Sequence, residues 1–258
     1  MTSRLPARNY LYSVTLLRDQ VPSYEAYPFS IPAIAAFDRL AFKKPVTFLI
    51  GENGTGKSTL LEGIAVAWGM NAEGGSRNFN FSTRDSHSGL GKHLRLDRSI
   101  PGARDHFFLR AESFYNLATA IENLDLHDVG PRGWASYGRK SLHEQSHGES
   151  FLTMFMNRFN GQGFYVLDEP EAALSPTRQM SLISVMHELV GQGAQFVIAT
   201  HSPILMAYPE AEIFEMTENG PRPVAYRDTE HFRVTRRFLN DPEAMLKILM
   251  EPEEEEDL

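Results

Sequence analysis

The sequence predicts an α/β fold in which a mainly parallel sheet is covered by helices on both faces. Apolar runs typical of buried strands alternate along the chain with segments of helical periodicity. The runs at 46–50, 164–167 and 196–199 are apolar over nearly their whole length, as expected for strands buried on both sides. With 258 residues, 42% of them hydrophobic and 22% charged, the chain is long enough to bury such a core.

The first half of the chain is predicted to contain strands at both ends of one well-marked helix. Apolar residues at 60, 61, 64, 65 and 68 fall on one helical face. Residues 71–105 are rich in Gly, Ser, Asn, Arg and Asp, which favours irregular or hairpin structure around a single strand. The expected strands are 10–16, 46–50, 93–96 and 107–109, and the expected helices are 59–68 and 113–126.

The second half has a more regular pattern. A glycine turn at 161–163 precedes a buried strand, and Ser175-Pro176 combines an N-cap with a first-turn proline. Gly191 and Gly193 are expected to end the helix that follows. The expected helices are 150–159, 176–190 and one opened by Asp241-Pro242, and the expected strands are 164–167, 196–199 and 212–216.

A phosphate-binding pattern stands between the strand at 46–50 and the next helix. Residues 51–58 read Gly-Glu-Asn-Gly-Thr-Gly-Lys-Ser, a complete G-x-x-x-x-G-K-[ST] loop in strand–loop–helix context. Glycines let backbone N–H groups close around phosphates, Lys57 reaches the β- and γ-phosphates, and Ser58 offers its hydroxyl to Mg²⁺. We therefore predict a nucleoside triphosphate site built from Gly51, Asn53, Gly54, Thr55, Gly56, Lys57, Ser58 and Thr59.

Two acidic residues and a histidine follow the later buried strands. Asp168 and Glu169 come directly after 164–167, and His201 follows 196–199 one βαβ unit later. Because the carboxyl ends of parallel strands meet at one edge of a sheet, these side chains are expected beside the phosphate site. There Asp168 would support Mg²⁺, Glu169 would polarise an attacking water, and His201 would donate a hydrogen bond toward the γ-phosphate or that water.

A short Ser-x-Gly pattern precedes the helix predicted at 150–159. Ser146 and Gly148 would offer a hydroxyl and backbone N–H groups at a helix N-terminus, which is a second anion-binding arrangement. The same pattern is about as typical of a plain helix cap. By itself it leaves both interpretations open.

In their order along the chain these motifs resemble those of the ABC-type ATPases. The order is the P-loop, Ser146-His147-Gly148-Glu149 in place of the signature, Asp168-Glu169-Pro170-Glu171, a D-loop-like stretch at 172–175, and the switch His201. The resemblance covers about residues 45–205 and looks like the soluble SMC/RecF-like branch, including small stand-alone bacterial proteins described as "predicted AAA-family ATPase". It implies a P-loop NTPase fold of ABC-ATPase type, with one domain over 1–250, a peripheral β layer and a small helical sub-lobe at about 113–160.

The resemblance also implies cofactors and residue roles. ATP and Mg²⁺ would be bound, and ATP and water would be converted to ADP and phosphate. Lys57 would hold the transferred phosphate, Asp168 would support the metal, and Glu169 would be the general base. Ser146 and Gly148 would contact the γ-phosphate of ATP bound by a second copy of the chain, so that ATP drives formation of a homodimer.

The sequence departs from the ABC pattern in three places. The segment 145–149 reads Gln-Ser-His-Gly-Glu, where the class usually has Leu-Ser-Gly-Gly-Gln. After 107–109, where a Q-loop glutamine is expected, Glu112 is the polar candidate, either as a Mg²⁺ ligand or as a helix cap. The aromatic residue that would stack on adenine is unassigned, and the candidates are Tyr24, Tyr27 and Phe29.

Charge is concentrated in two segments. Six acidic residues account for most of the formal net charge of −8 and indicate a solvated, disordered tail at 251–258, or an interaction tail. Seven Arg and Lys residues between Arg77 and Arg110 indicate a DNA-binding patch or a solvated face. The chain has no cysteine, no apolar leader and no apolar run of about 18 residues, so a cytoplasmic protein without membrane insertion is expected.

Three functions are compatible with these patterns. The first is an ATP-hydrolysing switch that dimerises on ATP and acts on DNA or on a protein partner, in DNA maintenance or defence. The second is the energy-coupling ATPase subunit of a membrane transporter, which the altered signature and the missing Q-loop glutamine disfavour. The third is a nucleotide-binding sensor that barely hydrolyses ATP, which the intact Glu169 disfavours.

Overall fold

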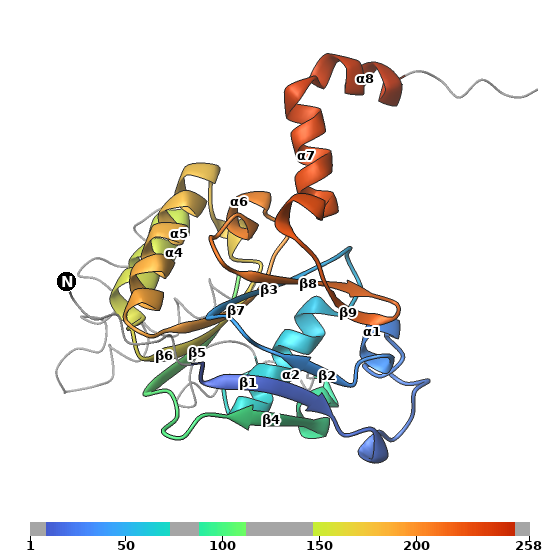
Figure 1. Cartoon of the computed structure of the whole chain (residues 1–258), viewed down its shortest axis with the longest axis vertical. Coiled ribbons are helices and arrows are strands. Elements are labelled where there is room, and N and C mark those ends of the chain that lie inside the picture. Colours follow the sequence, from blue (N-terminus) through green and yellow to red (C-terminus); the bar gives the residue numbers. More distant parts are fainter. Residues whose placement is uncertain (1–8, 73–87, 112–146, 251–258) are drawn as a thin grey trace, which may run out of the picture.

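Two β-sheets of unequal size organise the chain, in a computed structural model that describes residues 9–72, 88–111 and 147–250 (Figure 1). The larger sheet has the order β5-β6-β7-β3-β8-β9; its first five strands pair in parallel, and β9 pairs antiparallel with β8. The smaller sheet is antiparallel with the order β2-β1-β4. The strands are β1 (Leu11–Leu16), β2 (Arg39–Ala41), β3 (Val46–Ile50), β4 (Leu94–Arg98), β5 (Asp105–Arg110), β6 (Gly163–Asp168), β7 (Gln195–Ala199), β8 (Glu212–Thr217) and β9 (Gly220–Pro223).

Helices cover both faces of the larger sheet. α2 lies between the two sheets, whereas α4 and α5 lie side by side on the opposite face (Figure 1). The α-helices are α1 (Pro32–Ala35), α2 (Lys57–Trp68), α4 (His147–Arg158), α5 (Pro176–Gly191), α6 (Pro203–Met206), α7 (Glu230–Asn240) and α8 (Pro242–Met250). The 3₁₀ helices are η1 (Arg18–Gln20), η2 (Gly89–His93), η5 (Pro170–Ala173) and η6 (Tyr226–Asp228).

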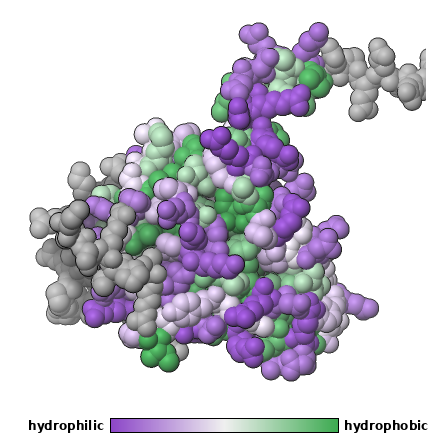
Figure 2. Space-filling model, viewed as in Figure 1, coloured by the Kyte–Doolittle hydropathy of each residue, from purple (hydrophilic) through white to green (hydrophobic). Residues whose placement is uncertain are grey.

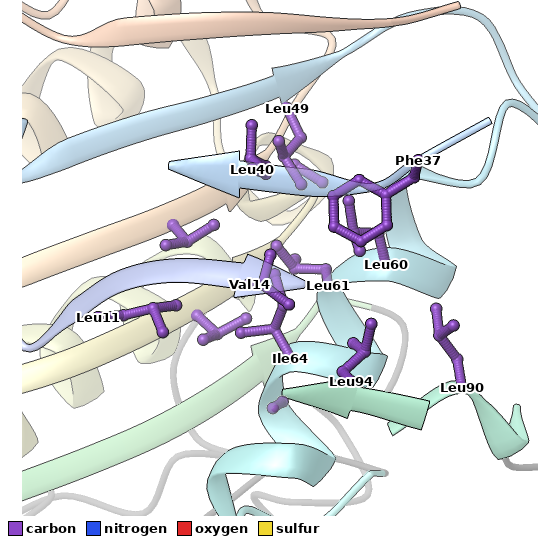
Figure 3. Close-up of a cluster of buried hydrophobic side chains, with 14 of the residues drawn as sticks. Leu11, Val14, Phe37, Leu40, Leu49, Leu60, Leu61, Ile64, Leu90 and Leu94 are labelled. Atoms are coloured by element: carbon purple, nitrogen blue, oxygen red, sulfur yellow. The ribbon is translucent and has the colours of Figure 1, made fainter. Parts of the chain in front are cut away.

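Alternating side chains of the central strands build a hydrophobic core on each face of the larger sheet. In β3, Phe48 belongs to the core that includes α4 and α5, whereas Leu49 belongs to the core that includes α2. Figure 3 shows this second core, in which Leu61 and Ile64 of α2 lie close to Val14 of β1. Each such buried side chain contributes about 1.5–3 kcal/mol. The helix that follows the P-loop is therefore held by the large sheet on one side and by the small sheet on the other.

Gln195 joins the two sheets. Its side chain is fully buried at the start of β7, where Oε1 accepts hydrogen bonds from the N–H groups of Tyr10 and Leu11 at 2.8 Å each. Its Nε2 donates to the carbonyl oxygen of Leu11 at 2.9 Å. These bonds satisfy a buried amide and the backbone groups at the start of β1. The small sheet is thereby fixed beside β7.

The helices α7 and α8 form an arm, residues 230–250, that extends away from the sheets (Figure 1). Neither helix has a buried residue. Figure 2 shows hydrophobic side chains at the outer end of the arm, and the exposed ones include Leu239, Leu249 and Met250. None of the helices in the described ranges is long and apolar enough to cross a membrane.

The predicted central strands are confirmed, but several other elements differ. The strands expected at 10–16, 46–50 and 212–216 are β1, β3 and β8, with shifts of at most one residue at their ends. The helix expected from residue 150 begins at His147, so Gly148 lies inside α4 rather than in a turn before it. α7, β2 and β9 are not among the elements expected from the sequence. The helix expected at 113–126, and with it most of the helical sub-lobe, lies outside the described residues.

Candidate active site

The loop between β3 and α2 has a backbone conformation that its glycines allow. Gly51, Gly54 and Gly56 have φ angles of 139°, 81° and 93°, a region that residues with a side chain seldom occupy. A Cβ on Gly51 would also come within 3.0 Å of the carbonyl oxygen of Met216 on β8. The glycines therefore let the chain turn from β3 into α2, so that the free N–H groups of the first helical turn border the loop.

Lys57 begins α2 with its ammonium group folded back onto this loop. Only 4% of the residue is exposed, and Nζ donates to the carbonyl oxygens of Gly51 and Glu52 at 2.8 Å each. Burial lowers the pKa of Lys57, and the nearby carboxylates of Glu169 and Asp168 oppose this shift. The loop thus encloses a lysine at the position from which phosphate oxygens are bound in P-loop proteins.

Ser58 and Asp168 meet at the carboxyl end of β6. Ser58 Oγ donates to Asp168 Oδ1 at 2.9 Å. A hydroxyl and one carboxylate are ligands that Mg²⁺ takes together with phosphate oxygens and water. Within the described ranges, no group of three or more His, Asp or Glu side chains is arranged to hold a metal ion by itself. The donor set therefore fits a magnesium ion whose coordination is completed by phosphate and water.

Arg110 and Glu62 extend this polar cluster. Arg110 Nε lies 3.5 Å from Asp168 Oδ2, and its Nη1 donates to Glu62 Oε2 at 3.1 Å. Glu62 is buried on α2, where its other oxygen accepts from the N–H and hydroxyl of Ser88 at 2.9 Å each. The guanidinium thus lies between two buried carboxylates. In the sequence Arg110 is one of several basic residues, and no local pattern indicates that it contacts Asp168.

Glu169 follows Asp168 in a left-handed backbone conformation, with φ 49° and ψ 51°. This conformation costs about 1–2 kcal/mol for a residue other than glycine. The N–H of Glu169 donates to the carbonyl oxygen of Ala199 at 2.9 Å, which holds the turn against the end of β7. Its side chain is 40% exposed. A strained backbone at such a place is typical of functional sites, and the carboxylate is accessible to water.

His201 lies next to Glu169 at the end of β7. Its Nε2 is 3.7 Å from Glu169 Oε1, and its backbone N–H donates to Glu171 Oε1 at 2.5 Å. On the other side of the ring, Nδ1 is 3.1 Å from Nε2 of His231 on α7. Burial lowers the pKa of His201, Lys57 lowers it further, and Glu169 opposes the shift. The imidazole is therefore favoured in its neutral form at neutral pH.

Three of the predicted ligand residues, Glu112, Ser146 and Gly148, are not seen in this cluster within the described part of the chain. Glu112 and Ser146 lie outside the described ranges. Gly148 lies in the first turn of α4, on the face of the sheet that α4 and α5 cover. Their predicted roles, as a metal ligand and as the signature of a second subunit, stay predictions.

The aromatic candidates for adenine stacking differ in exposure. Phe29 is buried, with its ring centre 5.0 Å from that of His93, so it belongs to the core. Tyr24 and Tyr27 are exposed, 42% and 62%. The hydroxyl of Tyr27 is 3.5 Å from Thr59 Oγ1 on α2, which makes Tyr27 the candidate beside the P-loop helix.

Two family models match this chain, one over the segment with the P-loop and one over the segment with the acidic residues and the histidine. The family described as "AAA domain, putative AbiEii toxin, Type IV TA system" matches residues 141–207, which contain Asp168, Glu169 and His201. A second family, described as "AAA domain", matches residues 33–105, which contain the P-loop.

Two solved structures described as ABC transporter components share the architecture at low sequence identity, and a third match has a lower TM-score. One, described as "An inward-facing conformation of a putative metal-chelate type ABC transporter", has a TM-score of 0.51 and 15% identity over 88% of each chain. The cbiO1 protein of the cbiONQ ABC transporter complex from Clostridium perfringens has a TM-score of 0.51 and 17% identity over 94% of this chain and all of that one. The SMC head domain from Thermotoga maritima has a TM-score of 0.42 and 17% identity over 72% of this chain and 92% of that one.

The two structures with TM-scores of 0.51 match over 88% and 94% of this chain, which includes the large sheet and the P-loop helix. At such low identity the structures establish the fold and nothing about substrate or partner. The chain has the P-loop NTPase fold of the ABC-ATPase type.

Proposed function

We propose that this chain is an ATPase that binds ATP with Mg²⁺, hydrolyses it to ADP and phosphate, and forms a homodimer when ATP is bound. One observation carries the proposal: Lys57 and Ser58, Asp168 and Glu169, and His201 lie at the carboxyl edge of the same sheet. The segments 33–105 and 141–207, which contain these residues, match families described as AAA domains. These matches support nucleotide hydrolysis rather than binding of some other anion.

Each side chain has a role that its position supports. Lys57 would hold the β- and γ-phosphates, and Ser58 and Asp168 would hold Mg²⁺, which when bound neutralises charge that develops on the transferred phosphoryl group. Glu169 would accept a proton as water attacks the γ-phosphorus. The bond from that phosphorus to the β–γ bridging oxygen then breaks, and ADP leaves. His201 would donate a hydrogen bond to a γ-phosphate oxygen.

The second half of the site would come from another copy of the chain. The N-terminus of α4, with Gly148 in its first turn and Ser146 just before it, would bind the γ-phosphate of the partner's ATP. The other end of α4 is anchored, since Arg158 Nη1 donates to Asp105 Oδ2 at 2.6 Å. A helix fixed at one end can present its N-terminus as a rigid surface to a second subunit.

Glu169→Gln tests this function directly. The amide keeps the shape of the side chain but cannot accept a proton, so we expect ATP hydrolysis to fall about 10²- to 10⁴-fold while ATP stays bound. In solution, light scattering should give the mass of a dimer with ATP and Mg²⁺ and of a monomer without them. Lys57→Ala is the matched control and should neither bind ATP nor dimerise. An undiminished rate in Glu169→Gln would remove the assigned base, and a monomer at every ATP concentration would remove the composite site.

For the wider role we propose action on DNA, in maintenance or in defence. Lys92, Arg95 and Arg98 are exposed at or near β4, the edge strand of the small sheet. The description of one matched family names a toxin of a type IV toxin–antitoxin system, which is in keeping with a defence role. Short duplex DNA should raise the ATPase rate, and more so at low salt. A rate that DNA leaves unchanged at low salt would contradict DNA as the partner.

A further inference from the structure

A second histidine contacts the switch histidine from outside the strand-end cluster. Nε2 of His231 lies 3.1 Å from Nδ1 of His201, and the two ring centres are 5.3 Å apart. His231 belongs to the first turn of α7, thirty residues further along the chain. Nothing in the function proposed above uses this residue.

The position of His231 is fixed by the start of α7. Thr229 is fully buried and caps the helix, since its hydroxyl accepts from the N–H of Phe232 at 3.2 Å. Tyr226 packs its ring 4.7 Å from that of Phe232 and donates from its hydroxyl to the carbonyl oxygen of Pro203 at 2.9 Å. Pro203 begins α6, two residues after His201. Two contacts therefore join the start of α7 to this segment: the Tyr226–Pro203 hydrogen bond just before the helix, and the His231–His201 contact in its first turn.

Both imidazole rings are favoured in the neutral form. Burial lowers the pKa of His201 and of His231, and the ammonium group of Lys57 lowers both further. Between two neutral rings, one nitrogen must donate and the other must accept. The carboxylates that oppose these pKa shifts are Glu169 at His201, and Glu230 and Glu215 at His231.

The surroundings determine which ring donates. Nδ1 of His231 and Nε2 of His201 are both buried without a hydrogen-bond partner among the described residues, so whichever of the two carries the proton is an unsatisfied N–H before nucleotide binds. Nε2 of His201 lies 3.7 Å from Glu169 Oε1, where a proton is attracted and a lone pair is repelled by the carboxylate. The carboxylate of Glu169 therefore favours the proton on Nε2 of His201, which leaves Nδ1 of His201 as an acceptor and Nε2 of His231 as the donor. His231 then donates to Nδ1 of His201.

We propose that His231 is a positioning residue for ATP hydrolysis: its Nε2–H donates to Nδ1 of His201 and holds the Nε2–H of His201 ready for the γ-phosphate. This inference rests on the ATPase function proposed above. Nε2 of His201 has no hydrogen-bond partner in the described part of the chain, so it is a donor that a phosphate oxygen would satisfy. Because His231 belongs to α7, the same contact links the ATP site to the arm at 230–250.

Three substitutions of His231 in the full-length chain test the inference. Phe keeps the ring but removes the donor, Gln places an amide N–H near the position of Nε2, and Asn places it near that of Nδ1. We expect His231→Phe and His231→Asn to lower kcat about 10- to 100-fold with little change in KM for ATP. His231→Gln should restore most of kcat. A role in packing alone would instead be rescued by Phe and not by Gln, and that pattern would overturn the inference.

The design separates this inference from the proposed function. If the wild-type chain hydrolyses ATP and His231→Phe keeps the wild-type kcat, the inference is wrong while the function stands. If the wild-type chain does not hydrolyse ATP, the function fails, and ¹⁵N NMR of the histidines still tests the contact. Nδ1 of His201 should then show the shift of a hydrogen-bonded acceptor in the wild type and lose it in His231→Phe; equal shifts in both would overturn the contact. Thermal unfolding of each variant confirms that it is folded before its rate is compared.

Discussion

Buried charge dominates the site at the scale of single residues. Lys57, Glu62 and Asp168 are each less than a tenth exposed. Taking such groups out of water is unfavourable unless an opposite charge or hydrogen bonds compensate. Carbonyl oxygens compensate Lys57, and Arg110 compensates both carboxylates. The site is therefore stable before nucleotide arrives only because these groups satisfy one another.

Arg110→Ala should destabilise the fold as well as the site. It would leave Glu62 and Asp168 without their shared cation, so we expect the free energy of unfolding to fall by about 1–3 kcal/mol. Arg95→Ala, on the neighbouring exposed surface of β4, is the matched control and should stay within about 0.5 kcal/mol of wild type. Urea denaturation measures both. Equal stability of the two variants would show that Arg110 does not compensate the carboxylates.

The sequence predicts the site residues that stand directly after strands, and it does not predict the contacts that Arg110 and His231 make with them. Ser58, Asp168 and His201 stand in or after contiguous motifs at strand ends, and parallel strands bring such positions to one edge. The contacts of Arg110 and His231 depend on how β5 and α7 pack, which local sequence does not encode. The ion pairs of Arg110 and the hydrogen bond of His231 are therefore visible only in the three-dimensional structure.

At the scale of elements, the arm differs from the rest of the chain. α7 and α8 contribute no buried residue, yet α7 carries arginines along one side and exposed apolar residues such as Val234 and Phe238 along another. This separation of arginines from apolar residues is itself a helical pattern, so a helix at 230–240 could have been predicted from the sequence. The short strands β2 and β9 are missed because pairing with a neighbour, rather than a long apolar run, makes them strands.

A variant that ends at Asn240 should keep the stability and the ATPase rate of the whole chain. It lacks α8, which has no buried residue, but it retains α7 and with it His231. We expect a melting temperature within about 2 °C of wild type, because little apolar surface is lost from the cores. Differential scanning calorimetry checks this. A large loss of stability would mean that α8 packs against the rest of the molecule.

At the scale of the whole molecule, two sheets enclose the P-loop helix and leave the site at the carboxyl edge of the larger one. Gln195 fixes the small sheet to β7, and α2 lies between the two sheets, so the helix that follows the P-loop is held from both sides. The mainly parallel pairing of the large sheet is expected from its nearly apolar central strands β3, β6 and β7 and could be predicted, whereas its strand order could not. The attachment of the small sheet through one buried amide could not, because Gln195 and Leu11 are distant in sequence.

The central claim is that each chain carries half of an ATP site and receives the other half from a second copy. Mixing two inactive variants tests it most directly. Lys57→Ala removes the phosphate-binding lysine, and Gly148→Asp places a carboxylate where the partner's γ-phosphate would bind. Each variant alone should hydrolyse almost no ATP.

In an equal mixture, each dimer that pairs one variant with the other has one site that combines an intact P-loop with an intact signature, whereas its second site lacks both. We therefore expect the mixture to recover ATPase activity, up to about half of the wild-type rate per chain, because one of the two sites of a two-fold symmetric mixed dimer is intact. A mixture no more active than its two components would contradict the account.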